Sequence, residues 1–401
     1  ESEGIEIHYE DNTDYIPKNV DTTLVVYTPA IPKDMGELVY VQENGYKVIK
    51  RSRTLGEITR GQRCMAVAGS HGKTTTSTLV SHLFMASGEG CSAFLGGISK
   101  NYNSNLLISG NDVVVAEADE FDRSFLQLFP EIAVITSMDA DHLDIYGDEE
   151  HIREAFKSFA SQVSGTVIAK YGLDITSADT KAEIKTYSFG NPEADFHAEA
   201  LDNGHFNLHY PDGVIEDCVV GIPGWVNIEN AVAASAIGLV YGLDPQKIKA
   251  ALATFSGVKR RFDLQVKKEG CVYIDDYAHH PEEIAAALSS IRKAYPAMKL
   301  TAAFQPHLYT RTRDFADEFA QALSNVDKLI LLEIYPAREE PIPGVTSEII
   351  FKDVTAPEKV LLKRAEFMEY MKNEEVELFV TLGAGDIDRF VGPIAEMLEN
   401  R

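Results

Sequence analysis

The chain has 401 residues, a length that predicts two or three domains at roughly 150 residues each. Its 37 Lys and Arg residues against 62 Asp and Glu residues give a formal net charge of −25, which argues against binding to nucleic acid or to an anionic membrane surface. An anionic substrate must therefore meet a local basic pocket. Hydrophobic residues make up 45% of the chain and charged residues 25%, as in globular proteins, and no apolar run approaches the roughly 18 residues of a membrane span.

Cysteine usage and the first residues bear on location. The four cysteines are far apart and form no C-x-x-C pair, which favours buried thiols in a reducing cytosol over disulfides or a zinc site: Cys64, Cys91, Cys218 and Cys271. Position 1 is Glu and the following residues are acidic and polar, so no signal peptide is predicted. We expect a cytoplasmic protein.

The first segment, residues 1–58, is too short for a complete α/β domain. It predicts a strand at 22–27, a short strand at 48–49 and a helix near Leu55. From residue 59 the chain alternates short apolar strands with amphipathic helices, which predicts a parallel sheet covered on both faces. The strands of this central domain are expected at 65–68, 113–116, 132–135 and 166–169.

A second alternation begins after residue 256 and predicts a separate, doubly wound domain over 257–401. Its expected helices include 281–294 and 314–324. Its expected strands lie at 272–274, 300–304, 329–333 and 378–382.

A phosphate-binding loop is the clearest local motif. A strand runs into Gly69-Ser-His-Gly-Lys-Thr-Thr-Thr76, where backbone N–H groups and a helix N-terminus can bind phosphate. Lys73 can reach the β and γ oxygens, with its tip facing solvent in the absence of nucleotide, and Thr74 can bind Mg²⁺. The usual first glycine of such loops is replaced by Val67, and Gly69 is the turn glycine.

Carboxylates follow the next buried strand. Glu117, Asp119, Glu120 and Asp122 lie where residues 113–116 emerge at the carboxyl edge of the sheet, the edge at which ligands bind in open α/β folds. His142 and its neighbour Asp141 follow the strand after that. Considered alone, these residues fit a solvated acidic loop as well as a metal site. Beside a phosphate loop, they favour a Mg²⁺ site.

The motifs resemble those of the Mur ligase family, the ATP-dependent amide-forming enzymes of peptidoglycan synthesis. The matching strings occur in family order from about residue 22 to the end. Besides the phosphate loop they are Glu117-Ala-Asp-Glu-Phe-Asp122, Asp139-Ala-Asp-His-Leu-Asp144, Asn227-Ile-Glu-Asn-Ala231, Arg260-Arg-Phe262, Asp275-Asp-Tyr-Ala-His-His-Pro281, Phe304-Gln-Pro-His-Leu-Tyr-Thr-Arg-Thr-Arg313 and Gly383-Ala-Gly-Asp-Ile387.

This resemblance implies an α/β, three-domain architecture. Residues 1–58 would be the remnant of a Rossmann-like, UDP-binding N-terminal domain, 59–256 a P-loop ATPase-like central domain and 257–401 a Rossmann-like amino-acid-binding domain. Within the family the strings are most similar to members that join L-alanine to the lactyl carboxylate of UDP-N-acetylmuramate through an acyl phosphate, releasing ADP and phosphate. The implied substrates are UDP-N-acetylmuramate and L-alanine, with ATP and Mg²⁺ as cofactors.

The family's site residues transfer by motif position. The catalytic residues would be Lys73, His279 and Arg311. Mg²⁺ would be bound by Thr74, Glu117 and His142. ATP would contact Gly69, Ser70, His71, Gly72, Lys73, Thr74, Thr75, Asn227, Asn230 and Asp276. The other substrates would contact Arg261, Tyr277, His279, His307 and Arg311.

The proposed roles at the amino-acid site agree with the chemistry of these side chains. Arg311 can form a bidentate pair with a carboxylate, which lysine cannot reproduce. His279 can accept the ammonium proton or orient the amine. His279 also precedes Pro281 and two glutamates, a pattern typical of a helix start, and both interpretations can hold together. An alternative interpretation is that Arg313 and, less readily, Arg311 pair with neighbouring acidic residues.

Two departures from the family pattern stand out. The string Gly224-Trp-Val-Asn227 lacks the Arg-His pair that usually precedes the adenine-binding asparagines. Residues 1–58 lack the opening strand and glycine turn that bind the UDP pyrophosphate. A molecule beginning at Glu1 is therefore expected to bind ATP but to bind UDP-N-acetylmuramate weakly.

Three alternatives remain at this stage. A recycling ligase attaches a whole tripeptide to the same sugar nucleotide, although its acidic-strand segment differs from residues 124–130 here. Folate-polyglutamate ligases share the phosphate loop, but the strings at 275–281 and 305–313 argue against them. A P-loop switch would hydrolyse ATP without forming an amide.

Overall fold

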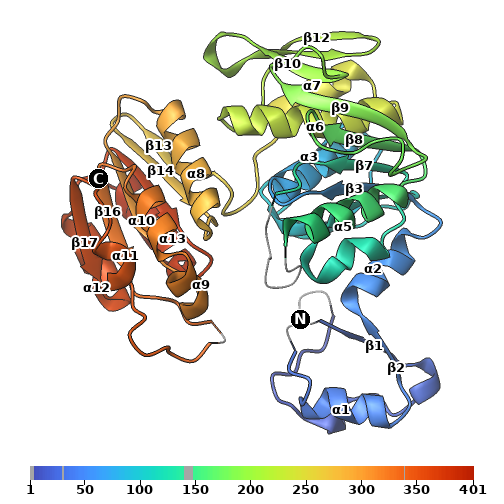
Figure 1. Cartoon of the computed structure of the whole chain (residues 1–401), viewed down its shortest axis with the longest axis horizontal. Coiled ribbons are helices and arrows are strands. Elements are labelled where there is room, and N and C mark those ends of the chain that lie inside the picture. Colours follow the sequence, from blue (N-terminus) through green and yellow to red (C-terminus); the bar gives the residue numbers. More distant parts are fainter. Residues whose placement is uncertain (1–3, 29–30, 140–147, 338) are drawn as a thin grey trace. The chain divides into compact units, whose positions relative to one another are not determined.

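The computed structural model describes residues 4–28, 31–139, 148–337 and 339–401 (Figure 1). The chain forms two compact units. The first unit comprises Glu1–Lys73, Gly90–Phe94 and Leu107–Tyr187, and the second comprises Thr74–Glu89, Leu95–Leu106 and Ser188–Arg401. All four cysteines are described, buried and outside any disulfide, as predicted. Among the described helices, none has the length and apolar character needed to cross a bilayer.

The first unit begins with a small two-stranded sheet. Strands β1 (Leu24–Tyr27) and β2 (Lys47–Lys50) pair in parallel around a core of Leu38, Val41 and Tyr46. The connecting and flanking helices are η1 (Thr13–Tyr15), η2 (Val20–Thr22), α1 (Gly36–Glu43) and α2 (Arg51–Thr59). The two predicted strands and the helix near residue 55 are confirmed.

Helix α2 packs closely on η3 (Phe121–Gln127). A Cβ added at Gly56 would lie 2.1 Å from the Gln127 carbonyl oxygen, so only a glycine permits this approach. The Arg60 guanidinium lies over the Phe129 ring, 4.1 Å from its centroid, and extends the contact beyond η3.

The centre of the first unit is a parallel sheet. This parallel part includes β3 (Arg63–Ala68), β6 (Val113–Ala118), β7 (Ile132–Ile135), β8 (Thr166–Lys170) and β9 (Glu183–Phe189), and β4 (Ser92–Ser99) also pairs with β6 in parallel. They follow the order β9-β8-β7-β3-β6-β4. Helix α5 (Glu149–Ser161) covers one face, where Phe125 stacks on Phe159 at 5.0 Å between ring centroids. The four predicted central strands are confirmed, within two residues at each end.

The second unit adds strands that the sequence did not predict. Strands β10 (Phe196–Ala200), β11 (Phe206–Tyr210) and β12 (Gly213–Cys218) form an antiparallel ribbon. With β4 (Ser92–Ser99) and β5 (Ser104–Leu107), the ten-stranded order is β12-β11-β10-β9-β8-β7-β3-β6-β4-β5. The remaining elements here are α3 (Lys73–Ala86), η4 (Asp202–Gly204), α6 (Trp225–Tyr241) and α7 (Pro245–Thr254).

The six-stranded sheet of the second unit has the order β13-β14-β18-β15-β16-β17. All pairs are parallel except the edge pair of β13 with β14. Its strands are β13 (Asp263–Lys268), β14 (Cys271–Asp276), β15 (Leu300–Phe304), β16 (Lys328–Leu332), β17 (Glu358–Leu362) and β18 (Leu378–Leu382).

Helices cover both faces of this sheet, which confirms the predicted doubly wound arrangement (Figure 1). The helices are α8 (Pro281–Ala294), α9 (Tyr309–Asp314), α10 (Ala316–Leu323), α11 (Glu348–Phe351), α12 (Arg364–Asn373), η5 (Asp386–Phe390) and α13 (Val391–Glu399). Helix α8 has the predicted limits. The helix predicted at 314–324 is confirmed as α10, within two residues at each end, and Phe315, whose backbone leaves the helical region, separates it from α9.

Candidate functional site

The phosphate loop joins β3 to α3 through a turn that requires glycine. Gly69 has φ +138°, and a Cβ there would lie 2.0 Å from Thr136 Oγ1. The loop is attached to the segment after β7, because His71 N donates to Ser137 Oγ at 2.9 Å and Ser70 Oγ donates to the Asp139 carbonyl at 2.8 Å. The segment after β7 therefore helps to fix the conformation of the loop.

Lys73 does not face solvent as expected. Its Nζ donates to the Gly69 carbonyl at 2.7 Å and to Glu120 Oε1 at 2.7 Å, and the side chain is only 14% exposed. Glu120 is buried; this burial raises the pKa of its carboxyl, while the Lys73 charge and hydrogen bond act in the opposite direction. The lysine is thus held over its own loop by a buried ion pair.

The predicted metal ligands are placed only in part. Glu117 lies at the end of β6, opposite Val67 of β3, and is half-buried. Thr74 is the second residue of α3 and is buried. His142 lies outside the described residues. Across the described ranges, no three His, Cys, Asp or Glu side chains converge as a metal site.

The predicted adenine-binding asparagines both lie on α6 and are buried. Asn230 Oδ1 accepts a hydrogen bond from Thr76 Oγ1 at 3.2 Å, which attaches α6 to the helix that follows the phosphate loop. Asn227 Nδ2 donates to the Pro223 carbonyl at 2.6 Å. In the string Gly224-Trp-Val-Asn227, which departs from the family pattern, Trp225 lies beside Phe189, with ring centroids 6.1 Å apart.

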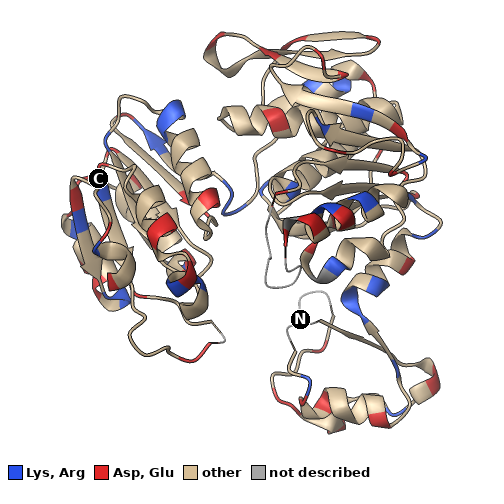
Figure 2. Ribbon diagram, viewed as in Figure 1, with Lys and Arg blue, Asp and Glu red and all other residues tan. Residues whose placement is uncertain are grey.

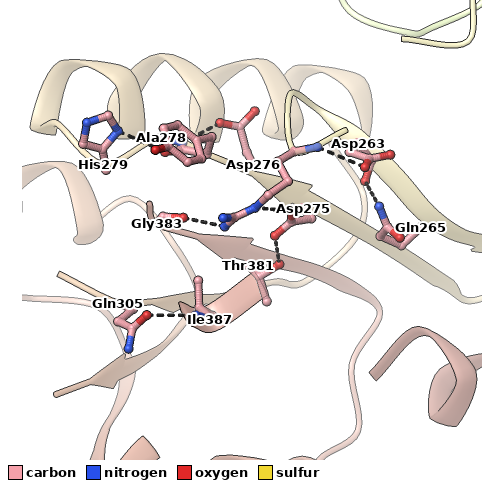
Figure 3. Close-up of polar contacts among 12 residues, drawn as sticks. Asp263, Gln265, Asp275, Asp276, Ala278, His279, Gln305, Thr381, Gly383 and Ile387 are labelled. Atoms are coloured by element: carbon pink, nitrogen blue, oxygen red, sulfur yellow. Dashed lines mark hydrogen bonds and ion pairs between the residues drawn. The ribbon is translucent and has the colours of Figure 1, made fainter. Parts of the chain in front are cut away.

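Asp276 ends β14 at the carboxyl edge of the six-stranded sheet (Figure 3). Its Oδ2 accepts from Phe262 N at 2.7 Å and its Oδ1 from Ala278 N at 2.8 Å. Burial raises the pKa of this carboxyl, against the lowering effect of the Arg261 charge and the two backbone donors. The carboxylate thus fixes two backbone segments as well as being a candidate ligand group.

Aromatic and imidazole rings gather after Asp276. The Tyr277 and His279 centroids are 5.2 Å apart, those of His279 and His307 6.1 Å apart, and His307 stacks on Tyr335 at 5.8 Å. The Arg261 guanidinium lies 5.2 Å from the Tyr277 centroid. The structure therefore brings together four of the five residues predicted to contact the substrates other than ATP.

His279 has a defined orientation. Its Nδ1 lies 3.1 Å from the Tyr277 carbonyl oxygen and 3.2 Å from Glu283 Oε2. Burial raises the pKa of Glu283, but the hydrogen bonds and charge of His279 outweigh it and hold that pKa below its usual range. Glu283 also accepts from His280 N at 3.2 Å in a capping box at the start of α8. The helix-start interpretation of these residues is therefore correct, and the same contacts orient the imidazole.

Arg311 lies on α9, four residues after His307. Its Nη1 is buried and has no hydrogen-bond partner among the described residues. Buried donors are normally paired, so this nitrogen is suited to an acceptor from a ligand. Arg313 instead pairs with Asp314 at 2.6 Å, as its alternative interpretation predicted.

Sequence reasoning missed two charged residues at the same sheet edge. Arg260 Nε lies 3.1 Å from Asp275 Oδ2, and Asp275 is fully buried. Both are the first members of doubled pairs, Arg-Arg and Asp-Asp. The doubled Arg-Arg and Asp-Asp pairs were the available signal in the sequence, but the family resemblance gave a role only to the second member of each pair.

The first unit also contains a basic pocket. The sequence predicted that an anionic substrate needs such a pocket, but it did not predict which residues form it. It has a volume of about 280 Å³ at the start of α2, whose Lys and Arg residues are blue in Figure 2. The lining residues are Tyr27, Val48, Ile49, Lys50, Ser52, Arg53, Arg123, Ser124 and Gln127. Three cations around one pocket stand out in a chain with a net charge of −25.

Three family descriptions match the chain. The Mur ligase family catalytic domain matches residues 1–63, the Mur ligase middle domain 67–238 and the glutamate ligase domain of Mur ligases 260–386. Together they span most of the sequence.

Known proteins resemble this chain over nearly its whole length. The UDP-N-acetylmuramate–L-alanine ligase of Parabacteroides distasonis is 50% identical over 99% of this chain and 88% of its own. The solved UDP-N-acetylmuramate-alanine ligase of Thermotoga maritima has a TM-score of 0.80 at 26% identity and covers 100% of this chain and 90% of its own. A murein peptide ligase from Psychrobacter arcticus, with a TM-score of 0.67 at 21% identity over 94% of this chain and 86% of its own, shares the fold.

Proposed function

The chain belongs to the Mur ligase family, and from this premise we propose that it joins L-alanine to the lactyl carboxylate of UDP-N-acetylmuramate, with conversion of ATP to ADP and phosphate. The observation that carries the proposal is the 50% identity, over 99% of this chain, to a ligase of that name. The product belongs to peptidoglycan precursor synthesis. The buried thiols agree with a cytoplasmic location, which we also propose.

The first half of the reaction activates the carboxylate. A carboxylate is a poor electrophile, and phosphorylation by ATP converts it to an acyl phosphate with a good leaving group. Residues 69–75 bind the phosphates through backbone N–H groups at the start of α3. Lys73 leaves the Gly69 carbonyl and donates to phosphate oxygens, where its charge stabilises the transferring group. Asn227, Asn230 and Asp276 bind the nucleoside.

The oxygen donors of Thr74 and Glu117 fit Mg²⁺, which prefers oxygen ligands and few protein groups beside phosphates. We assign Thr74 and Glu117 as its ligands, together with His142. Mg²⁺ supplies neutralisation of phosphate charge. Because Glu117→Gln removes one charge and little volume, it is expected to raise the Mg²⁺ concentration needed for half-maximal ADP release about tenfold and to leave the circular dichroism spectrum unchanged. An unshifted Mg²⁺ titration would remove Glu117 from the metal site.

The second half forms the amide. Arg311 binds the alanine carboxylate through its buried Nη1. His279 directs Nδ1 toward Tyr277 O and Glu283, so Nε2 is the nitrogen placed to accept the ammonium proton. Arg261, Tyr277 and His307 line the same region. No nucleophilic side chain is required.

The basic pocket of the first unit supplies a site for the anionic sugar nucleotide. Lys50, Arg53 and Arg123 line it, and its walls include the ends of β1 and β2. We therefore assign residues 1–58 to sugar-nucleotide binding, 59–256 to ATP and 257–401 to the amino acid.

The experiment that tests the function is ADP release from the full chain with UDP-N-acetylmuramate and, in turn, each common amino acid and a tripeptide. ADP release that depends on both the sugar nucleotide and L-alanine is the expected result. Preference for a tripeptide acceptor would indicate the recycling ligase. Turnover of ATP that ignores both substrates would indicate a P-loop switch and would overturn the proposal.

A further inference from the structure

The turn at residues 260–262 has an unusual backbone. Arg260 has φ +64° and Phe262 has φ +46°, a region that favours glycine over larger residues. Two such residues within three positions persist only where the surroundings hold them. The turn therefore needs specific restraints, and the structure shows them.

Three backbone groups of the turn are restrained by its neighbours. Arg260 N donates to Asp263 Oδ2 at 3.0 Å, and Phe262 N donates to Asp276 Oδ2 at 2.7 Å. The Arg260 carbonyl accepts from Tyr277 N at 2.7 Å. The turn and the loop after β14 are thereby joined into one structure that carries Arg261, Asp276 and Tyr277.

The Arg260 side chain also restrains this turn, through contacts with Asp275 at the end of β14 and with Gly383 just after β18. Its Nε pairs with Asp275 Oδ2 at 3.1 Å and its Nη2 donates to the Gly383 carbonyl. Asp275 Oδ1 accepts from Thr381 Oγ1 at 2.6 Å, as the dashed line between the neighbouring strands shows in Figure 3. Thr381 Oγ1 lies 3.0 Å from the Tyr273 hydroxyl, so the cluster is fully hydrogen-bonded.

A buried ion pair of this kind is weak evidence for a stabilising role, because removing two charges from water offsets their attraction. The geometric effect of the pair is better supported, since the Asp275 carboxylate and the Gly383 carbonyl both restrain the Arg260 side chain and therefore the turn that carries it. We propose that Asp275, acting through Arg260 and supported by Thr381, is a positioning residue that holds Asp276 and Arg261 in the geometry needed to bind the nucleotide. This inference rests on the nucleotide role given above to Asp276.

The charge of Asp275 makes the arrangement sensitive to pH. Burial raises the pKa of this carboxyl to about 6, against the lowering effects of Arg260 and Thr381. The groups that face it are the Arg260 guanidinium, the Asp276 and Asp263 carboxylates and the Tyr273 and Thr381 hydroxyls. Protonation of Asp275 weakens its bond to Arg260, so nucleotide affinity is expected to fall as the pH drops through about 6.

The test is calorimetric titration of the full chain with ADP at pH values from about 5 to about 8. Asp275→Asn keeps the shape and removes the charge, and we expect at least about tenfold weaker ADP binding at about pH 7.5 and a smaller fall in affinity below about pH 6, leaving only the part that comes from protonation of the ADP phosphate. The matched control is Asp327→Asn, because Asp327 also binds an arginine, Arg292 at 2.9 Å, and a backbone N–H, that of Leu300, but at the start of β15. The control is expected to keep wild-type affinity and the wild-type fall in affinity at low pH.

Thr381 keeps the proposal testable if Asp275→Asn does not fold. Thr381→Val removes the hydroxyl that stabilises ionised Asp275 and is expected to move the fall in affinity to higher pH, whereas Thr381→Ser restores its position. Wild-type ADP affinity and an unchanged fall in affinity at low pH in Asp275→Asn, or in Thr381→Val where that is the variant tested, would overturn the proposal. Because ADP binding requires neither alanine nor sugar nucleotide, failure of the ligase assignment would appear in the turnover assay and not here.

Discussion

The turns at Gly69 and at Arg260 reach the left-handed backbone region by opposite means. The phosphate loop uses glycine, and its neighbours leave no space for a Cβ. The turn at residues 260–262 uses arginine and phenylalanine, held by carboxylates of three aspartates. A tight turn at a ligand site can therefore be encoded by the absence of a side chain or by the hydrogen bonds that side chains make. Only the first leaves a recognisable sequence motif.

The largest expected effect concerns Lys73 and its ion pair with Glu120. Lys73→Ala is expected to lower turnover by about a hundredfold or more, because the lysine charge stabilises the transferring phosphoryl group. It also leaves the Glu120 carboxylate buried without its cation, so the free energy of unfolding at about pH 7.5 should fall by about 1–3 kcal/mol.

The double variant Lys73→Ala, Glu120→Gln separates these two effects. It should recover most of the lost stability in urea unfolding and none of the turnover. Recovery of turnover would place the catalytic charge elsewhere.

The next effect tests the turn that depends on glycine. Gly69→Ala must displace Thr136 and Ser137, so we expect a loss of about 2–3 kcal/mol in unfolding free energy and loss of ATP binding. Gly61→Ala is the matched control, because Gly61 has φ +78° with nothing within 4 Å of an added Cβ. The control should lose only about 1 kcal/mol and keep ATP binding. Equal losses in the two variants would mean that backbone conformation alone, without the close contact, explains the glycine.

The turn held by side chains is tested by its pH dependence. The pKa of Asp275 rises from 3.8 in the unfolded chain to about 6 in the folded protein. The folded state therefore holds this proton more tightly, and its contribution to stability is present below about pH 4 and is lost as the pH rises to about 6. The difference amounts to about 3 kcal/mol.

The measurement is urea unfolding of wild type and Asp275→Asn at several pH values. At each pH, the unfolding free energy of Asp275→Asn is subtracted from that of wild type. This difference isolates the Asp275 carboxyl from other titrating groups, among them Glu120, whose pKa is also raised on folding, and Glu283, whose pKa is lowered. A difference curve that rises between about pH 4 and about pH 6 would contradict the burial argument.

The smallest effect distinguishes the amino-acid side from the nucleotide side. Arg311→Lys replaces a planar donor by a point charge and is expected to raise the KM for alanine by about tenfold, roughly 1–2 kcal/mol, with the KM for ATP little changed. Arg313→Lys serves as the control, because Arg313 pairs with Asp314 at the surface. Equal weakening of ATP and alanine would assign Arg311 to the nucleotide.

Prediction from the sequence succeeded where local pattern and tertiary structure agree. Strands of the parallel sheets are buried on both faces, so their apolar runs appear directly, as at Ile132–Ile135 and Leu300–Phe304. The ribbon β10–β12 was missed although β10 alternates the buried Phe196 and Ala198 with the half-buried His197, a pattern typical of a strand with one covered face.

The site shows the same limit. The phosphate-loop motif and the family resemblance named Lys73, Asp276 and His279 as candidate residues, but they did not predict that Lys73 binds Glu120 across 47 positions or that Arg260 binds Gly383 across 123. These contacts depend on which strands become neighbours. The order β14-β18-β15 is a property of the whole sheet, and no local pattern specifies it.

The close approach at Gly56 has a consequence for sequence divergence. The hydrogen on its Cα faces the Gln127 carbonyl, and α2 and η3 each supply residues to the basic pocket. A larger residue at position 56 would therefore be tolerated only with a compensating shift of the backbone near 127. Among related chains, these two segments are expected to change together, as a co-varying pair 71 positions apart. Substitution of the buried Gly56 would then also change the ligand selectivity of the basic pocket.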